Sequence, residues 1–160
     1  MARHSILMSG EVPYPRWASR LVRRCIRTAL RAERVHVPCE INVLFTDDEG
    51  IRGLNRDLRG VDKSTDVLSF PAFSFFPGAF DAENGESDPE SGLLPLGDMA
   101  LNMDKITQQS KEYGTGEKRE TAYLTVHSVL HLLGYDHVDE GEDKRQMRAR
   151  EKTIMRMMRL

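Results

Sequence analysis

Residues 117–137 read EKRETAYLTVHSVLHLLGYDH, and they constrain the fold more tightly than any other stretch of the chain. Apolar side chains recur in this stretch at helical spacing and form one stripe. The stripe includes Tyr123, Val126, Leu130 and Leu133. Gly134 follows directly, and glycine readily adopts the left-handed conformation in which helices end. We therefore predict a helix over 117–133 and a sharp turn at Gly134.

Three histidines in this stretch have the spacing of a metal site. His127 and His131 are four residues apart, so on a helix both imidazoles leave the same face. The turn at Gly134 brings His137 back toward them. Three neutral imidazoles with an open fourth position form the ligand set of a catalytic zinc ion. We predict one Zn²⁺ per chain on His127, His131 and His137, in a site type that also accepts nickel, copper or iron.

The residue after the first histidine argues against a peptidase. The histidine spacing is similar to that of the metzincin proteases, in which a glutamate at this position acts as the general base. Here the residue is Ser128, which cannot accept a proton near neutral pH. The two cysteines, Cys25 and Cys39, are expected to be buried thiols and not ligands, because a pair of distant cysteines without a secretory signal does not indicate a disulfide framework.

Outward from this stretch, the patterns predict four strands mixed with four or more helices. A T-x-x-E capping box at Thr46 and Glu49 opens the short second helix. The predicted strands are 5–9, 39–45, 66–70 and 96–103, and the predicted helices are 14–34, 46–58, 117–133 and 139–159. Residues 71–95 are rich in Pro, Gly, Ser and acids and predict a long loop. The fold class is α/β (α+β), a single domain with a small mixed sheet and the metal site at the end of a helix in the C-terminal half.

Composition and charge restrict the setting of the protein. The 160 residues contain no apolar run long enough to cross a membrane and no signal-peptide pattern, so we expect a cytoplasmic protein without membrane contact. Residues 81–90 hold five acids and no base, and outside them 23 basic side chains face 20 acidic ones. Arginine outnumbers lysine 17 to 6, which favours an anionic partner. For the arginines spread over residues 20–31, a solvated helix surface is favoured over a nucleic-acid contact.

Three motifs together resemble those of a known family. The string HSVLHLLGYDH at 127–137 resembles the H-G-x-L-H-L-x-G-Y-D-H signature of the YbeY family of metal-dependent endoribonucleases. Leu54-Asn55, Arg59-Gly60 and DKSTDVLSFP at 62–71 resemble its L-N-x-x-x-R-x-x-D-x-x-T-D-V-L-S-F-P stretch, and LGDM at 96–99 resembles its L-G-D-I strand. Ser128 stands where the family usually has glycine, an exchange of small residues expected to matter little. The terminal helices match only in character, and the loop at 72–95 is longer than usual.

The resemblance implies an activity and a set of functional residues. It implies an endoribonuclease for single-stranded RNA that acts in 3′-end maturation of small-subunit rRNA and in ribosome quality control. It implies one YbeY-like metallohydrolase domain over 1–160, with zinc on the three histidines and Arg59 as the arginine required for activity. An arginine fork suits this role, because it binds a phosphate through two parallel hydrogen bonds and stabilises developing charge. Lys63 is either a further phosphate contact or a solvated loop residue.

Several alternatives stay open at this point. Asp66 and Asp98 either orient a metal ligand or have a structural role, which is favoured. The proton acceptor is either Asp136, the acid nearest to the ligands in sequence, a metal-bound hydroxide or the RNA 2′-hydroxyl. The chain is either a nuclease, or a zinc-binding ribosome assembly factor with little nuclease activity, or a peptidase without the usual glutamate, and the last is disfavoured by Ser128. The cleavage position, the oligomeric state and the role of the acidic loop are not determined.

Overall fold

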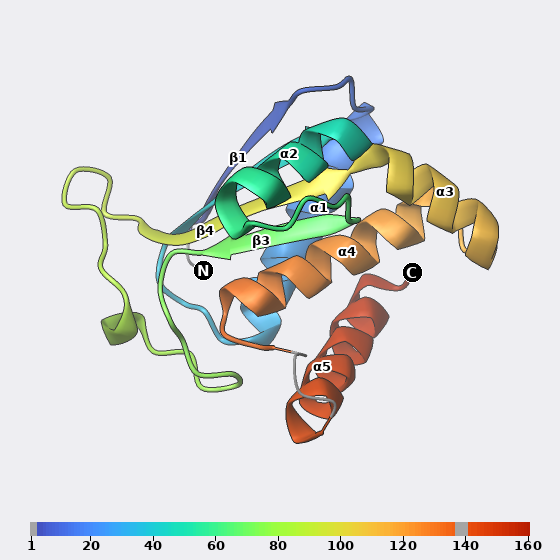
Figure 1. The fold of residues 1–160 in the computed structure, drawn as a ribbon. Coiled ribbons are helices and arrows are strands. Elements are labelled where there is room, and N and C mark those ends of the chain that lie inside the picture. The colour runs from blue at the N-terminus through green and yellow to red at the C-terminus, as the bar shows by residue number, and fades with distance from the viewer. Residues whose placement is uncertain (1–2, 137–140) are drawn as a thin grey trace.

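A four-stranded sheet forms the centre of the computed structural model, which describes residues 3–136 and 141–160 (Figure 1). Its strands are β1 (Ser5–Gly10), β2 (Cys39–Thr46), β3 (Val67–Pro71) and β4 (Leu94–Asn102), in the spatial order β1-β2-β4-β3. β1, β2 and β4 are parallel, whereas β3 runs antiparallel to β4 at the edge. The alternating burial of β2 agrees with its alternating sequence, CEINVLFT, because successive side chains of a strand point to opposite faces.

Five α-helices surround this sheet in the described part of the chain. They are α1 (Arg16–Ala32), α2 (Asp48–Arg59), α3 (Met103–Tyr113), α4 (Glu117–Leu132) and α5 (Glu142–Met158). The main core joins one face of the sheet to α1 and α4, with α5 packed outside these two helices (Figure 1). α2 covers the other face and forms a small second core around Ile51, Leu68 and Ala100. α4 is therefore enclosed on most sides, which explains why ten of its residues are buried.

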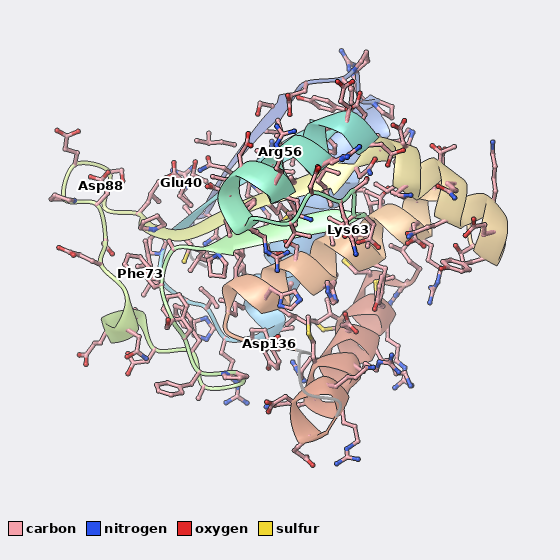
Figure 2. The ribbon with its side chains drawn as sticks, in the orientation of Figure 1. Glu40, Arg56, Lys63, Phe73, Asp88 and Asp136 are labelled. Carbon is pink, nitrogen blue, oxygen red and sulfur yellow. The ribbon has the colours of Figure 1, made fainter. Side chains whose placement is uncertain are left out.

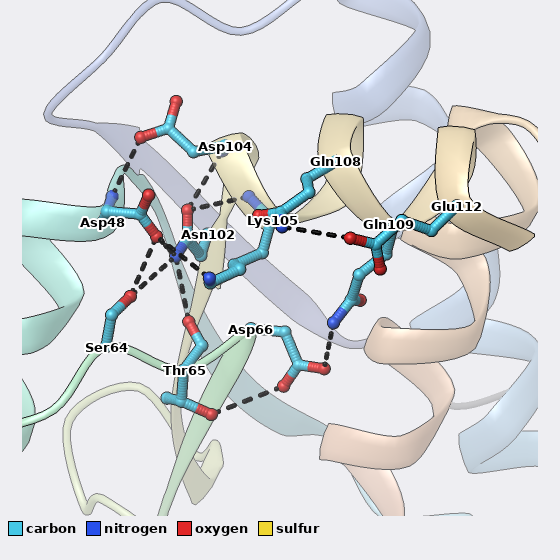
Figure 3. Close-up of polar contacts among 10 residues, drawn as sticks. All are labelled: Asp48, Ser64, Thr65, Asp66, Asn102, Asp104, Lys105, Gln108, Gln109 and Glu112. Atoms are coloured by element: carbon cyan, nitrogen blue, oxygen red, sulfur yellow. Dashed lines mark hydrogen bonds and ion pairs between the residues drawn. The ribbon is translucent and has the colours of Figure 1, made fainter.

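A buried asparagine connects four segments at the end of β4 (Figure 3). The Asn102 amide nitrogen donates to Asp48 Oδ1 at 2.8 Å and to the carbonyl oxygen of Thr65 at 2.9 Å. Its amide oxygen accepts from the backbone nitrogens of Asp104 and Lys105, which caps α3. The hydrogen bond from Asn102 also lowers the pKa of the Asp48 carboxyl below its usual value. These contacts hold the chain between α2 and β3 against the start of α3.

The predicted elements are confirmed with three corrections. Helix α3 is not among the predicted elements, because it buries only Ile106 and Ser110 and so has a weak apolar stripe. The capping box was wrong, because Asp47 caps α2 by accepting from the Gly50 nitrogen, while the hydroxyl of Thr46 donates to Glu11. β4 begins at Leu94, two residues earlier than predicted, and the loop before it contains a short 3₁₀ turn, Ala82–Asn84. The start predicted for the last helix, 139–140, lies outside the described residues.

The expectation that both cysteines are buried thiols is confirmed. Cys25 and Cys39 are fully buried free thiols, one in α1 and the other at the start of β2. No helix of residues 3–136 and 141–160 is both long and apolar enough to span a membrane.

Candidate functional site

An open cleft of about 650 Å³ lies where β3, the end of α4 and the segment after α4 meet. Its lining combines apolar side chains of β3 and of the following loop with polar groups from four separate parts of the chain. The polar side chains that line it include Arg59, Asp66, Ser69, His127, His131 and Asp136. Two of the three predicted zinc ligands and the predicted catalytic arginine therefore share one cleft.

His127 and His131 converge at this cleft with a defined orientation of their rings. Their Nε2 atoms lie 3.0 Å apart. His131 Nδ1 lies 2.9 Å from the carbonyl oxygen of Tyr135, which can only accept, so this nitrogen carries a proton and donates. His127 Nδ1 lies 2.6 Å from Glu151 Oε2 and donates to that carboxylate. In their neutral forms both imidazoles consequently present an unprotonated Nε2 to the same region.

This arrangement fits a metal ion. Two acceptor nitrogens at 3.0 Å repel one another unless a proton or a cation lies close to both. Zinc–nitrogen bonds of about 2.0–2.1 Å at a tetrahedral angle place two ligand nitrogens about 3.3 Å apart, close to the observed separation. His137 lies outside the described residues, so the third ligand stays a prediction. Within residues 3–136 and 141–160, no three His, Cys, Asp or Glu side chains form a metal-binding group.

Glu151 on α5 is a site residue that the sequence analysis missed. Its side chain is almost fully buried, and besides His127 it accepts a hydrogen bond from the Tyr123 hydroxyl at 3.3 Å. Burial, and then the nearby Glu151 charge, raise the pKa of Tyr123 to about 12, so this hydroxyl stays protonated and donates. A carboxylate that accepts from the outer nitrogen of a metal-binding histidine fixes its ring and increases its basicity. One sequence signal was present: Glu151 lies four residues after Met147 and four before Met155, on the apolar side of its helix.

Gly134 positions the wall of the cleft after α4. Its φ of +100° is rare for residues with a side chain, and a Cβ at this position would lie 2.0 Å from the carbonyl oxygen of Phe75. The glycine thus lets the loop after β3 pack directly on the end of α4. The next residue, Tyr135, is buried and donates from its hydroxyl to Glu33, the residue directly after α1. This anchor fixes the backbone carbonyl that orients His131.

Ser69 on β3 and Ser128 on α4 form a hydrogen bond of 2.6 Å beneath the histidines. Ser128 is fully buried, and Ser69 is its sole hydrogen-bond partner among the described residues. If Ser69 donated, the buried proton of Ser128 would have no acceptor, at a cost of about 1–3 kcal/mol. The favoured direction is therefore from Ser128 to Ser69, which leaves the Ser69 proton for a group in the cleft. The exchange of the usual glycine for Ser128 thus gives this chain a contact that a glycine cannot make.

The other predicted residues are placed as follows. Arg59, the last residue of α2, is exposed at the cleft and forms no ion pair with any described residue. Lys63 lies on the segment between α2 and β3 and is not part of the cleft lining, so its role in RNA binding stays a prediction (Figure 2). Asp66 lines the cleft and accepts from Gln109. Burial, and then the nearby charge of Asp66, raise the pKa of Glu120.

Asp98 and Asp136 differ in their surroundings. Asp98 accepts from the Asn42 amide at 2.8 Å on the sheet and does not line the cleft, in agreement with the favoured structural role. Asp136 is exposed and lines the cleft just beyond the end of α4 (Figure 2). It shares the cleft with His127 and His131 and stays a candidate proton acceptor.

Comparison with known proteins gives a consistent result. The family model described as Endoribonuclease YbeY matches residues 10–159. Endoribonuclease YbeY of Clostridium botulinum (strain Loch Maree / Type A3) is 46% identical over 145 residues, which cover 87% of each chain. The same-named proteins of Clostridium kluyveri (strain NBRC 12016) and Thermoanaerobacter sp. (strain X514) are 44% and 47% identical, covering 88% and 84% of this chain and 89% and 84% of theirs.

A solved structure supports the fold. The solution structure of TM1509 from Thermotoga maritima has a TM-score of 0.57 and 21% sequence identity, over 99% of this chain and 92% of that one. At this identity the likeness concerns the arrangement of the chain alone. The family match over nearly the whole sequence, together with the relatives above 40% identity, confirms the motif-based prediction: the chain belongs to the endoribonuclease YbeY family.

Proposed function

We propose that this protein is a zinc-dependent endoribonuclease that cleaves single-stranded RNA in the cleft between β3 and α4. One observation carries the proposal: the Nε2 atoms of His127 and His131 converge at 3.0 Å in a cleft that Arg59 also lines. His137 completes the proposed ligand set. The names of the relatives, Endoribonuclease YbeY, support RNA as the substrate class.

The residues of the cleft have complementary roles in this proposal. A bound zinc ion supplies a Lewis acid for a phosphoryl oxygen and lowers the pKa of a bound water. Arg59 binds the scissile phosphate and stabilises the charge that develops on its oxygens, because it is not neutralised by a described acid. Ser69 donates its hydroxyl proton to the substrate from β3. Glu151 keeps the His127 ring in one orientation and one tautomer.

A peptidase is the weaker candidate for a structural reason as well as a sequence reason. Ser128 occupies the position of the missing glutamate, and its hydroxyl is buried in the contact with Ser69. It is neither basic nor directed at a substrate. An assay with casein is therefore expected to give no cleavage.

The main test is cleavage of a labelled single-stranded RNA by the purified protein and by the His131→Ala variant. We expect the wild type to cut and to hold one zinc per chain, and the variant to lose both properties. His36→Ala is the matched control, because His36 is exposed and far in sequence from the cleft. If His131→Ala cuts as fast as the wild type, the metal-centred nuclease is refuted. If no preparation cuts but all bind immature ribosomal subunits, the assembly-factor interpretation replaces it.

Arg59→Ala separates phosphate binding from metal binding. We expect this variant to keep its zinc and its fold and to lose roughly 10²- to 10³-fold in cleavage rate, as when one donor to a developing oxyanion is removed. Arg56→Ala, on the same helix but outside the cleft lining, is the control and is expected to cleave normally. An unchanged rate in Arg59→Ala would remove Arg59 from the catalytic group.

The cellular part of the proposal rests on the family resemblance. We propose that the substrate is the 3′ end of small-subunit rRNA, that the protein works on the ribosome in the cytoplasm, and that it contributes to ribosome quality control. Cleavage of precursor rRNA within purified immature small subunits, mapped at the 3′ end, tests this assignment. If the protein cleaves free RNA but leaves the precursor rRNA in the subunit intact, the proposal is restricted to a general single-strand nuclease.

A further inference from the structure

The exposed face of α5 carries a basic ridge, formed by Arg148, Lys152 and Arg156. These residues are spaced by four, so they follow one another along one face of the helix with a rise of about 6 Å per step. All three are exposed, and none forms an ion pair with a described residue. This sets them apart from Arg150 on the same helix, whose charge is neutralised by Glu33 at 2.6 Å. The basic ridge is therefore a row of cations without internal partners in the described part of the chain.

The basic ridge borders a groove between α4 and α5 that leads to the histidines. The outer part of this groove has a volume of about 410 Å³ and is lined by all three ridge residues together with Tyr123. The inner part, of about 240 Å³, is lined by Tyr123, Arg148 and His127. The two parts share Tyr123 and Arg148, and His127 also lines the main cleft. The outer part thus adjoins the inner part at Tyr123 and Arg148, and the inner part adjoins the main cleft at His127.

Tyr123 adds an aromatic surface to the inner part of this groove. Tyr123 is 39% exposed, although its hydroxyl donates to Glu151. Its ring lies against that of His127, with centroids 6.0 Å apart and an angle of 30° between the planes. A row of cations beside a fixed aromatic ring is the combination that binds single-stranded nucleic acid, because it neutralises phosphates and offers a surface for a base.

Within the part of the chain that the structure describes, neither the acidic loop segment nor the acid in the groove lining neutralises the basic ridge. The acidic segment 81–90 belongs to the loop before β4, which projects on the side of the molecule away from α5 (Figure 1). Glu151, the acid within the groove lining, is buried and occupied by His127 and Tyr123. Arg119 also lines the groove and donates to the main-chain oxygen of Leu160.

We propose that the groove between α4 and α5 binds the sugar–phosphate backbone of single-stranded RNA beyond the scissile phosphate, with successive phosphates on the basic ridge. This inference rests on the proposed function and extends the substrate site from one phosphate to a run of nucleotides. It predicts that a long RNA binds more tightly than a short one. It also predicts that binding through the ridge weakens with salt, because each phosphate contact releases counterions.

The test compares two triple charge reversals with the same change in net charge. One variant is Arg148→Glu/Lys152→Glu/Arg156→Glu on the basic ridge. The control reverses three exposed arginines of α1 outside both clefts, Arg20, Arg27 and Arg31. Binding of a fluorescent single-stranded RNA is measured by anisotropy in the His131→Ala background, in which the RNA stays intact. Circular dichroism and thermal unfolding show whether each variant is folded, and the milder triple change to glutamine replaces a reversal that does not fold.

We expect the ridge variant to bind the long RNA at least tenfold more weakly than the control. For three lost contacts the slope of log affinity against log salt should become shallower by about 2. With His131 restored, the ridge variant should lose more of its cleavage rate on the long RNA than on a dinucleotide, which has a single internal phosphate. Equal losses in both variants, or an unchanged affinity and slope in the ridge variant, would overturn the proposal. The proposal would also be overturned if the ridge variant kept its full affinity for RNA but no longer bound ribosomal particles. In that case the groove would be a surface for docking a protein.

The binding readout keeps this inference separate from the nuclease assignment. If the wild type cleaves no RNA, the proposed function fails, yet the difference between the ridge variant and the α1 control still decides whether the groove binds RNA. If the wild type cleaves RNA and the two variants bind it equally, the groove inference fails alone.

Discussion

The Glu151→Gln substitution removes one negative charge behind the histidine pair and nearly preserves the shape of the side chain. Glu151 is 4% exposed, and its carboxylate lies 2.6 Å from His127 Nδ1. A neutral amide oxygen accepts a weaker hydrogen bond than a carboxylate, and an amide nitrogen in its place would face the His127 N–H. We therefore expect His127 to lose basicity at Nε2 and part of its fixed orientation, while the cleft keeps its shape.

The size of the effect follows from the role of this contact. Partners of the outer nitrogen of a metal-binding histidine typically contribute roughly 10- to 100-fold in metal affinity, or about 1.4–2.7 kcal/mol. We expect the zinc dissociation constant of Glu151→Gln to increase within this range, measured by competition with a chromophoric chelator. The cleavage rate at saturating zinc should decrease less than the affinity, because the ligand set itself is retained.

Two controls distinguish this role from a general effect of charge on α5. Glu142→Gln removes the same charge from an exposed position on the same helix, where Glu142 pairs only with Arg145 in the described structure, and should leave zinc affinity unchanged. Tyr123→Phe removes the second donor to Glu151 and should have a smaller effect than Glu151→Gln. If Glu151→Gln is folded and binds zinc as tightly as the wild type, the assignment of Glu151 as the partner of a metal ligand is refuted.

Three further predictions concern the packing around the site. Ser69→Ala leaves the buried hydroxyl proton of Ser128 without an acceptor and should lower the free energy of unfolding by about 1–3 kcal/mol, whereas Ser128→Ala should lower it less. Equal decreases in urea unfolding would contradict donation from Ser128 to Ser69. Gly134→Ala places a side chain at a positive φ and against the backbone of Phe75, so it should lower the free energy of unfolding by about 3 kcal/mol or more and weaken zinc binding. An unchanged melting temperature would contradict the turn conformation of Gly134. Burial raises the pKa of both Cys25 and Cys39 to about 12, so iodoacetamide at pH 8 should label them only after unfolding. Because the folded chain then holds these protons more tightly than the unfolded chain, stability should decrease as the pH rises above about 9, and a flat profile there would contradict the shifts.

The features that the sequence alone determined are those set by neighbours along the chain. Alternation predicted β2, and the apolar stripe before Gly134 predicted α4 and its end, because side-chain direction repeats with a fixed period in each element. The spacing of His127 and His131 placed both rings on one face of α4, and the structure brings their Nε2 atoms together. The same local motifs were sufficient to predict the family. The polar helix α3 escaped this reasoning because its stripe of two buried residues is too weak to stand out.

Only the tertiary structure decided which distant residues meet these local elements. The antiparallel position of β3 beside β4 and α4 places Ser69 against Ser128, and the packing of α5 on α4 brings Glu151 to His127 across 24 residues of sequence. The α4–α5 groove and its basic ridge likewise depend on how two helices lie against each other. Local propensity contains no information on such pairs, because they are chosen by the burial of apolar faces and by the need of buried polar groups for partners.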